Sequence, residues 1–257
     1  MNRAVDLRWP RKESSAPRSI ASGAKSPCSN PPLRLTLQGH GRNPGADPAK
    51  STPLAIHLHQ SDLPDRLTLG PVVAIDTETM GLDPRRDRLC VVQLSDGAGD
   101  AHLVQIAKGQ TRAPNLERLL ADPATLKLFH YGRFDIAVMK KAFGVTTAPV
   151  WCTKIASKLI RTFTDRHGLK YLLADLVGVD VSKQQQTSDW GAETLTEAQR
   201  DYAASDVLYL HALKAELEAR LIREDRMELA ERLFAFLPTR AELDLLGWED
   251  ANDIFLH

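Results

Sequence analysis

The feature that most restricts the fold of this chain is a short apolar run, Val72–Ile75, followed at once by acidic residues. An uninterrupted run of this length is typical of a β-strand that is covered on both faces of its sheet. Side chains alternate along a strand, so Asp76 and Glu78 are expected to point to the same side, roughly 6–7 Å apart. Two carboxylates so close to an apolar interior are costly unless a positive charge compensates them.

The segments after this strand predict an α/β fold with a mixed sheet. Two further strand-like segments follow the first across turn-rich connections, "GLDPRRD" and "DGAGD", and helical and extended segments then alternate. A meander of three strands followed by such alternation is typical of a mixed sheet with flanking helices. The predicted strands after the first are 88–96, 101–106, 126–130 and 150–153, and the predicted helices are 115–122, 132–143, 154–160, 168–178 and 196–221.

Two of these helices have distinct sequence signals. Ile136, Met139 and Phe143 lie at helical spacing and predict one buried stripe on the helix 132–143. Thr196 and Gln199 have the spacing of a capping box and predict the start of the long helix. Between them, residues 180–193 are polar and predict a loop. The segment after residue 221 predicts one or two more helices and a tail.

Composition divides the chain into three parts. Residues 1–52 are rich in Ser, Pro, Arg and Gly, and residues 1–50 carry nine Lys/Arg against three Asp/Glu. We expect 1–52 to be a disordered basic extension, although it also faintly resembles an organellar transit peptide. The predicted catalytic domain is 53–222, and 223–257 forms C-terminal helices and a tail. The chain after residue 50 has 24 basic against 30 acidic residues, so bulk charge does not argue for nucleic-acid binding.

The cysteines and the hydropathy indicate the compartment. The chain has three cysteines, Cys28, Cys90 and Cys152, which are scattered and show no zinc-ligand spacing. This pattern predicts a reducing environment without a disulfide framework. No apolar run approaches a transmembrane length, and no signal-peptide core is visible. We therefore expect a soluble, cytoplasmic protein that does not contact membranes.

Two more acidic residues are placed where functional groups are common. Asp135 follows a predicted strand at the start of a helix, and Asp206 shares a helix face with Tyr202, four residues earlier. Each has a simple structural explanation when taken alone: Asp135 could stabilise a helix terminus, Asp206 could pair with an arginine, and Tyr202 could belong to the core. Together with the pair Asp76 and Glu78, these three residues in this order and spacing favour a common function instead.

These motifs resemble a known family. "DTETMGL", "HYGRFD" and "YAASD" look like the three exonuclease motifs of the DEDD superfamily, whose catalytic domain has a ribonuclease H-like (DnaQ-like) fold. The tyrosine four residues before the last aspartate resembles the tyrosine subclass. The segment "KQQQTSDWGAETLTEAQRDYAASDVLYL" is similar to ribonuclease D, in a short form lacking the accessory HRDC domains. The ending "GWEDANDIFLH" resembles alphaproteobacterial short forms, which implies a bacterial protein.

The resemblance implies a metal-dependent 3′–5′ exoribonuclease that releases nucleoside 5′-monophosphates from RNA 3′ ends, including tRNA-type ends. Two divalent metal ions, Mg²⁺ or Mn²⁺, are the implied cofactors, because carboxylate ligands suit hard cations. Tyr202 would orient the attacking water and the scissile phosphate. The implied metal ligands are Asp76, Glu78, Asp135 and Asp206.

The same resemblance suggests which residues contact the substrate. Leu82 stands where the superfamily places an apolar wedge, with Met80 beside it, although a core role for either is an equal alternative. For His130 a satisfied histidine at a strand end is equally plausible, and for Lys183 a solvated surface position is the stronger alternative. Gln184 is a further candidate for phosphate contact. The predicted substrate-binding residues are Thr79, Met80, Gly81, Leu82, His130, Phe134, Lys183 and Trp190.

Alternatives remain at this point. A DNA 3′–5′ exonuclease would carry the same motifs, because none of them reports a contact to the 2′-hydroxyl. An RNA-binding module that has lost catalysis is a third possibility, and the intact carboxylate set argues against it. The pair His57 and His59 also suggests a metal site, but no third ligand is near in sequence. A surface strand is the expected reading of that pair.

Overall fold

The computed structural model describes residues 55–181, 184–248 and 252–255. The expected extension 1–52 and the candidate Lys183 lie outside these ranges. The strands are β1 (Ile56–Gln60), β2 (Val72–Thr79), β3 (Leu89–Ser95), β4 (Ala101–Gln105), β5 (Leu126–Phe129) and β6 (Val150–Cys152). The helices are α1 (Pro114–Ala121), α2 (Gly132–Phe143), α3 (Thr153–Ile160), α4 (Leu169–Leu172), the π-helical turn η1 (Leu173–Val177), α5 (Glu197–Leu208), α6 (Leu210–Arg223) and α7 (Met227–Leu245).

The six strands form one mixed sheet, as the sequence predicts. Its order is β1-β4-β3-β2-β5-β6. β2, β3 and β4 are antiparallel neighbours and form the expected meander. β1 pairs with β4, β5 with β2 and β6 with β5, and all three pairs are parallel. β2 is therefore a central strand, which explains why its sequence is a continuous apolar run.

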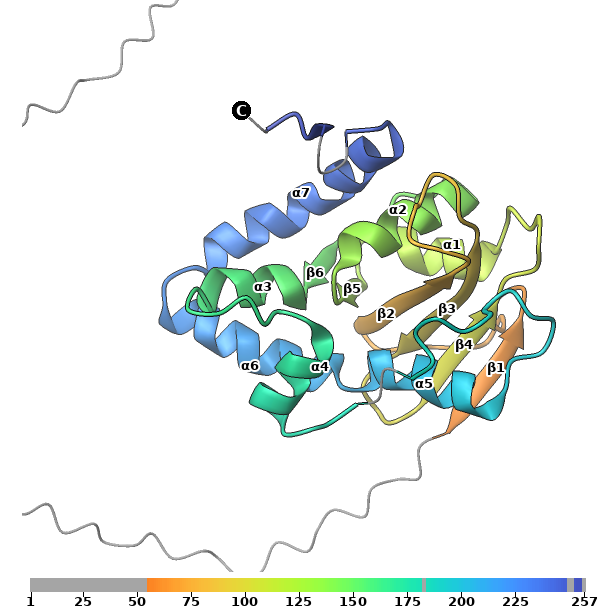
Figure 1. The fold of residues 1–257 in the computed structure, drawn as a ribbon, viewed down its shortest axis with the longest axis horizontal. Helices are drawn as coiled ribbons and strands as arrows, with labels where there is room; N and C mark the ends of the chain where they lie inside the picture. Colours follow the sequence, from red (N-terminus) through yellow and green to blue (C-terminus); the bar gives the residue numbers. More distant parts are fainter. Residues whose placement is uncertain (1–54, 182–183, 249–251, 256–257) are drawn as a thin grey trace, which may run out of the picture. The chain divides into compact units, whose positions relative to one another are not determined.

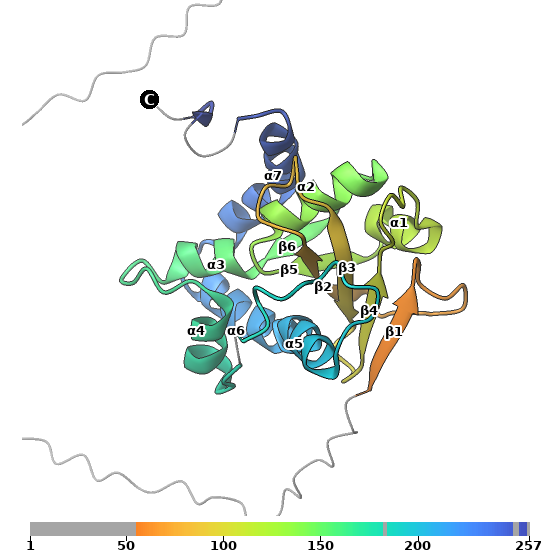
Figure 2. The same cartoon turned by 45° about the vertical axis from the view of Figure 1, so that its right-hand side comes forward.

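Helices cover the sheet on both sides (Figures 1 and 2). Helix α2 contacts β2, β3 and β5, whereas α5 contacts β1, β2, β3 and β4 from the other side. The predicted stripe on α2 is confirmed, because Ile136, Met139 and Phe143 are all buried. The capping box of α5 is also confirmed: the Thr196 hydroxyl accepts from the Gln199 amide, and the Gln199 side chain accepts from the Thr196 amide. These helices bring two chain segments far apart in sequence to β2.

The prediction of one continuous helix over 196–221 was wrong. Tyr209 has φ −101° and ψ 0°, outside the helical region, and it separates α5 from α6. The break has a packing reason. Before it, α5 lies on β1 to β4; after it, α6 packs mainly against α3, η1 and α7 and also contacts β5. The His211 ring hydrogen-bonds to the carbonyl oxygen of Val72 at 3.0 Å, which attaches the start of α6 to the start of β2.

The segment 168–178 also differs from its prediction. A short α-helix is followed by a π-helical turn that ends at Gly178, whose φ is 77°.

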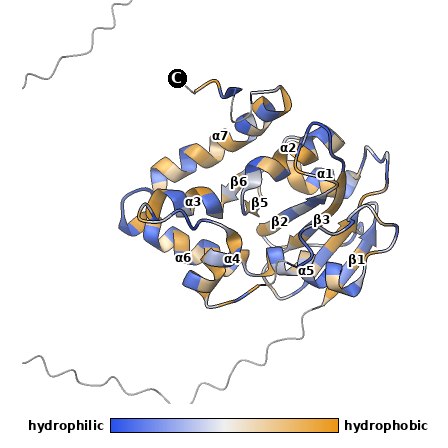
Figure 3. Ribbon diagram, in the orientation of Figure 1, coloured by the Kyte–Doolittle hydropathy of each residue, from blue (hydrophilic) through white to orange (hydrophobic). Residues whose placement is uncertain are grey.

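The α7 helix follows α6, and hydrophobic and hydrophilic residues alternate along both (Figure 3). Cys90 and Cys152 are buried free thiols. Within the described ranges, no helix is long and apolar enough to cross a membrane.

Candidate active site

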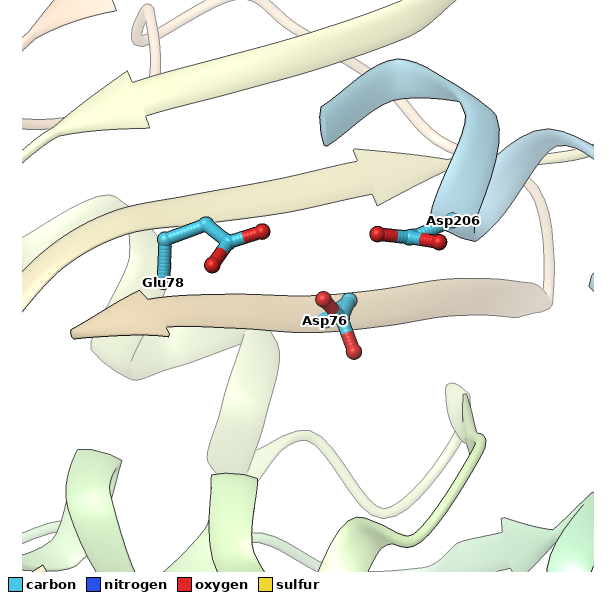
Figure 4. A group of neighbouring side chains, drawn as sticks. All are labelled: Asp76, Glu78 and Asp206. Carbon is cyan, nitrogen blue, oxygen red and sulfur yellow. The ribbon is translucent and has the colours of Figure 1, made fainter. Parts of the chain in front are cut away.

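Three predicted carboxylates meet above β2. Asp76 and Glu78 project from this strand on one side, and Asp206 comes from α5 (Figure 4). One oxygen from each of the three lies within 4.8 Å of the others. Strand alternation brings the first two together, and the helix that covers this face brings the third. The two strand positions are expected to be roughly 6–7 Å apart, and their side chains point so that the carboxylate oxygens come closer together than that.

The backbone changes register at this point of the sheet. The pairing between β2 and β3 shifts between Glu78 and Thr79, so that Thr79 faces Leu89. Such irregularities re-aim side chains and end strand pairing, and they are common beside active sites. The Thr79 hydroxyl then donates to the carbonyl oxygen of Gly81. This contact holds the turn that carries residues 80–82 next to the carboxylates.

Asp135 lies in the same cavity but outside the group of three. Its side chain is buried, and its Oδ1 accepts a 2.7 Å hydrogen bond from the Thr77 hydroxyl of β2. Gly132 allows the close approach of α2 to the end of β5, because a Cβ there would lie 2.7 Å from the Cβ of Phe129. The first turn of α2 can thus bring Asp135 to β2.

Burial and mutual repulsion raise the pKa values of these acids. Burial and then repulsion from Asp135, Asp206 and Glu78 raise the pKa of Asp76 well above its ordinary value. Burial and then repulsion from Asp206 and Asp135 raise the pKa of Glu78 to about 9. Burial raises the pKa of Asp135 to about 7, against the effect of the Thr77 hydrogen bond. In the described part of the chain, no lysine or arginine is among the groups that shift these three pKa values.

This site fits a divalent cation. Like charges that are buried together favour the binding of a positive ion, and the raised pKa values of Asp76, Glu78 and Asp135 reflect burial and this repulsion. Oxygen ligands without histidine or cysteine favour hard ions such as Mg²⁺ and Mn²⁺. Asp76, Glu78 and Asp206 are the residues that can hold such an ion directly.

Tyr202 lies one turn before Asp206 on α5 and lines the same cavity. Burial and then the negative charges of Asp206, Glu78 and Asp76 raise the pKa of its hydroxyl. The group therefore stays protonated at neutral pH and can donate a hydrogen bond. The Trp190 ring packs against Tyr202, with ring centroids 6.0 Å apart.

The carboxylates open into a cavity of about 600 Å³. Apart from the further candidate Gln184, it brings together every described residue that the sequence predicted for substrate binding. Leu82 and Met80 are 88% and 52% exposed, so the alternative of a core role is wrong for both. The predicted residues that line the cavity are Thr79, Met80, Gly81, Leu82, His130, Phe134 and Trp190.

Two of these side chains have structural contacts as well. The Nδ1 atom of His130 hydrogen-bonds with the Thr153 hydroxyl at 2.8 Å, in line with the alternative of a satisfied histidine. Trp190 is only 2% exposed, so most of its surface supports Tyr202 and the neighbouring core. Substrate contact by His130 or Trp190 stays a prediction. Gln184 is not among the residues that line the cavity.

Several residues of the cavity wall were not predicted from the sequence, among them Tyr131 and Lys154. Tyr131 stands between the named candidates His130 and Phe134, so the motif "HYGRFD" could have suggested it. Lys154 follows the short β6 strand, and only the parallel pairing of β6 with β5 brings it to the site. This pairing joins strands that are distant in sequence, and no short sequence pattern around Lys154 predicts it.

The pair His57 and His59 lies in β1, as expected for a strand. No third ligand is near this pair in sequence, but the sheet brings a distant histidine to it: the Nε2 atom of His59 is 3.0 Å from the Nδ1 atom of His102. His57 instead contacts Asp100 at 3.3 Å. Among the described residues, the group of three or more side chains that could hold a metal consists of carboxylates alone.

A ribonuclease H-like mixed sheet with an acidic cluster above its central strand defines the class of DnaQ-like exonucleases. The chain belongs to the 3′–5′ exonuclease family, which matches residues 59–222. These residues therefore form a 3′–5′ exonuclease domain.

Several known proteins are similar to this chain. Solved structures of Brucella melitensis NrnC, one with bound Mg²⁺ and one bound to pGG, are both 58% identical and cover 79% of this chain and 99% of NrnC, with TM-scores of 0.74 and 0.75. Ribonuclease D of Acidiphilium cryptum is 40% identical over 165 residues, which is 64% of this chain. Ribonuclease D of Escherichia coli is 28% identical, with a TM-score of 0.60, and the match covers 67% of this chain and 45% of that one. The chain spans about two fifths of the length of the curated ribonuclease D relatives, 41% for the Acidiphilium protein.

Proposed function

We propose that this exonuclease hydrolyses RNA from the 3′ end and releases nucleoside 5′-monophosphates, with two divalent metal ions, Mg²⁺ or Mn²⁺, as cofactors. The observation that carries the proposal is the convergence of Asp76, Glu78 and Asp206 within 4.8 Å in a cavity that Asp135 and Tyr202 also line. When bound, divalent cations supply Lewis-acid stabilisation of the phosphoryl group undergoing displacement.

The chain's own residues perform the other tasks. Asp76, Glu78 and Asp206 hold the cations, and Asp135 completes the acidic wall from α2. Tyr202 donates its hydroxyl proton in a hydrogen bond to the attacking water or the scissile phosphate. Its raised pKa makes it a poor base, so its task is orientation. Leu82, exposed at the cavity, provides an apolar surface against the terminal bases.

We further propose that short 5′-phosphorylated RNA is the substrate. The support is the structure of NrnC bound to pGG, because NrnC is 58% identical to this chain and almost its whole length is covered. A second candidate is the 3′ end of structured, tRNA-type RNA, which the ribonuclease D relatives favour. Cytoplasmic location belongs to the same proposal.

The test uses purified protein with Mn²⁺ or Mg²⁺ and 5′-labelled substrates resolved on a sequencing gel. The substrates are an RNA dinucleotide, a 20-nucleotide RNA, a tRNA with a 3′ extension, and a DNA matched to the 20-nucleotide RNA. We expect metal-dependent hydrolysis of RNA from the 3′ end, fastest on the dinucleotide and abolished by EDTA. Faster trimming of the tRNA would select the second candidate. Equal or faster trimming of DNA would contradict an RNA substrate, and binding of RNA without hydrolysis would contradict an enzyme.

A further inference from the structure

Tyr131 lies on the border of two cavities. It lines the cavity of the carboxylates and also a second one of about 360 Å³. Leu82 and Phe134 are shared in the same way, whereas none of the four acidic residues of the site lines the second cavity. The second cavity therefore continues the substrate cleft beyond the place where the bond is hydrolysed.

Tyr131 has an unfavourable backbone conformation that places its ring at this border. Tyr131 precedes the first turn of α2 with a φ of 64° and ψ of 36°. This left-handed conformation is unfavourable for a residue with a Cβ, and such residues cluster at functional sites. The ring is nevertheless 44% exposed, so hydrophobic burial explains little of its position.

Lys154 places a positive charge on this ring. Its Nζ lies 3.9 Å from the centre of the Tyr131 ring. Lys154 also lines the carboxylate cavity, where the only other lysine among the described lining residues is Lys170. Lys170 forms an ion pair with Asp180 at 3.2 Å. Lys154 has no carboxylate within ion-pair distance in the described part of the chain, so its charge remains available to an anion.

We propose that Tyr131 and Lys154 form one substrate-binding unit, in which Tyr131 stacks on the base of a nucleotide that flanks the scissile phosphate and Lys154 binds a phosphate of the same substrate. The proposal rests on the RNA exonuclease function proposed above and extends it to two residues that no motif marks. Stacking on an aromatic ring suits every base, and a lysine recognises phosphate as a point charge. Burial and then repulsion from Lys158 lower the pKa of Lys154, and the negative charge of a bound phosphate would act in the opposite direction.

A similar pair of a tyrosine and a cation lies outside both cavities. Tyr171 is 42% exposed and lies under Arg166, whose Cζ is 4.4 Å from the ring centre. Neither residue lines the two cavities. A tyrosine covered by a cation is thus not by itself a binding site, and Tyr171 serves as the control for Tyr131. Lys158, exposed on α3 and outside both cavities, is the control for Lys154.

The experiment measures KM and kcat of the full chain with a 5′-phosphorylated RNA dinucleotide and with two analogues that lack the 5′ or the 3′ base. Tyr131→Asn removes the ring and suits the left-handed backbone, because asparagine tolerates this conformation. We expect Tyr131→Asn to raise KM about tenfold or more on the complete substrate, from the loss of base stacking. One of the two abasic analogues lacks the base on which Tyr131 stacks. On that analogue, the wild type and Tyr131→Asn should have equal KM values, because there is no stacking to lose. Tyr131→Phe should behave as the wild type.

Lys154→Met tests the phosphate contact through its salt dependence. The slope of log KM against log salt should become shallower by about one phosphate contact, and Lys154→Arg should restore it. The control variants Tyr171→Asn and Lys158→Met should change the KM on the complete substrate less than about twofold. They should leave the slope of log KM against log salt as it is in the wild type. Circular dichroism and thermal unfolding of each variant check the fold.

The outcomes separate this inference from the proposed function. If the wild type hydrolyses no RNA, the proposed function fails and this unit fails with it. If the wild type is active but a folded Tyr131→Asn variant has an unchanged KM, or loses affinity equally on complete and both abasic substrates, stacking is wrong. An unchanged salt slope in Lys154→Met overturns the phosphate contact.

Discussion

The carboxylate cluster and the ion pairs around Asp244 both bury charge, but the buried acids differ in their neighbours. Asp244 of α7 is 5% exposed and accepts two hydrogen bonds from the Arg133 guanidinium, at 2.5 and 2.6 Å. Arg240 contacts the same carboxylate at 3.0 Å and Asp253 at 2.9 Å. Opposite charges alternate through this network.

In the carboxylate cluster, acids lie beside acids, and their mutual repulsion helps to raise the pKa values of Asp76 and Glu78. Glu78 and Asp135 have their pKa values raised to about 9 and about 7, with burial as the first cause for each. A network of opposite charges can hold a helix in place, whereas acids that repel one another at depth cost stability. The fold tolerates this cost where a bound cation can offset it, so the comparison separates a structural use of buried charge from a functional one.

The largest expected effect is on catalysis. Asp76→Asn removes one charge from the cluster and should lower kcat on RNA at least about a thousandfold, because cation binding contributes several kcal/mol at a phosphoryl centre. The same variant should unfold at an equal or higher temperature without divalent ions, since repulsion is relieved. Steady-state kinetics and thermal unfolding check both.

Asp201→Asn is the matched control for this variant. Asp201 lies on α5, beside Tyr202, and its side chain is exposed. Its substitution should change kcat less than about twofold. A drop in Asp201→Asn comparable with that in Asp76→Asn would show that charge on α5, rather than the cluster, controls the rate.

The balanced network should respond in stability. Asp244→Ala leaves Arg133 and Arg240 without their shared partner and should lower the free energy of unfolding by about 3–5 kcal/mol. Glu242→Gln, on the same helix, breaks an exposed contact with Lys140 at 3.2 Å and should cost less than about 1 kcal/mol. Denaturant titration measures both, and equal losses would contradict the distinction between the two pairs.

The pH dependence of stability should show the repulsion directly. A carboxyl group with a raised pKa in the folded chain stabilises it fully below the unfolded pKa, and this contribution is lost as pH rises through the folded pKa. For Glu78 the window runs from its ordinary 4.5 to about 9. In EDTA the unfolding temperature should therefore fall over this window, and Mg²⁺ or Mn²⁺ should raise it by about 5 °C or more at pH 8 but less at pH 6.

Glu78→Gln isolates this contribution from that of other groups. Its unfolding temperature in EDTA should fall less steeply with pH than that of the wild type. A wild type that is stabilised by rising pH relative to Glu78→Gln would contradict the direction of the shift.

The smallest effect concerns how α5 is held over the cluster. Thr196→Ala removes the capping hydroxyl that accepts from the Gln199 amide at 3.2 Å. The loss should be about 1 kcal/mol in the free energy of unfolding. Thr196→Ser keeps the hydroxyl and should cost less than half of this value. An equal loss in both would mean that the methyl group of Thr196, and not the cap, matters.

Local patterns predicted the elements that the structure shows around the site. The apolar run of β2, the stripe of α2 and the capping box of α5 each act over a few residues, so sequence alone indicates them. Side-chain periodicity also predicted that Asp76 and Glu78 share a side of β2. The grouping with Asp206 came from a resemblance of motifs, since no periodic pattern relates residues so far apart.

Long-range packing decided the remaining features. The break at Tyr209 arises because α5 lies on four strands of the sheet whereas α6 packs mainly against other helices, which no local propensity reports. Lys154 reaches the cavity through the pairing of β6 with β5. The contact of His59 with His102 depends on the pairing of β1 with β4, whose sequences are more than 40 residues apart. Register between distant strands is set by the whole sheet, so these contacts could not be predicted.

The most direct test of the account is calorimetric titration of Mn²⁺ into the metal-free protein near neutral pH. The wild type should bind Mn²⁺ with release of protons, because acids with raised pKa values must ionise to bind a cation. Asp76→Asn and Asp206→Asn should lose most of this binding, whereas Asp244→Asn, if folded, should retain it. Mn²⁺ binding that is equal in the wild type and in both cluster variants would contradict a metal site at these carboxylates.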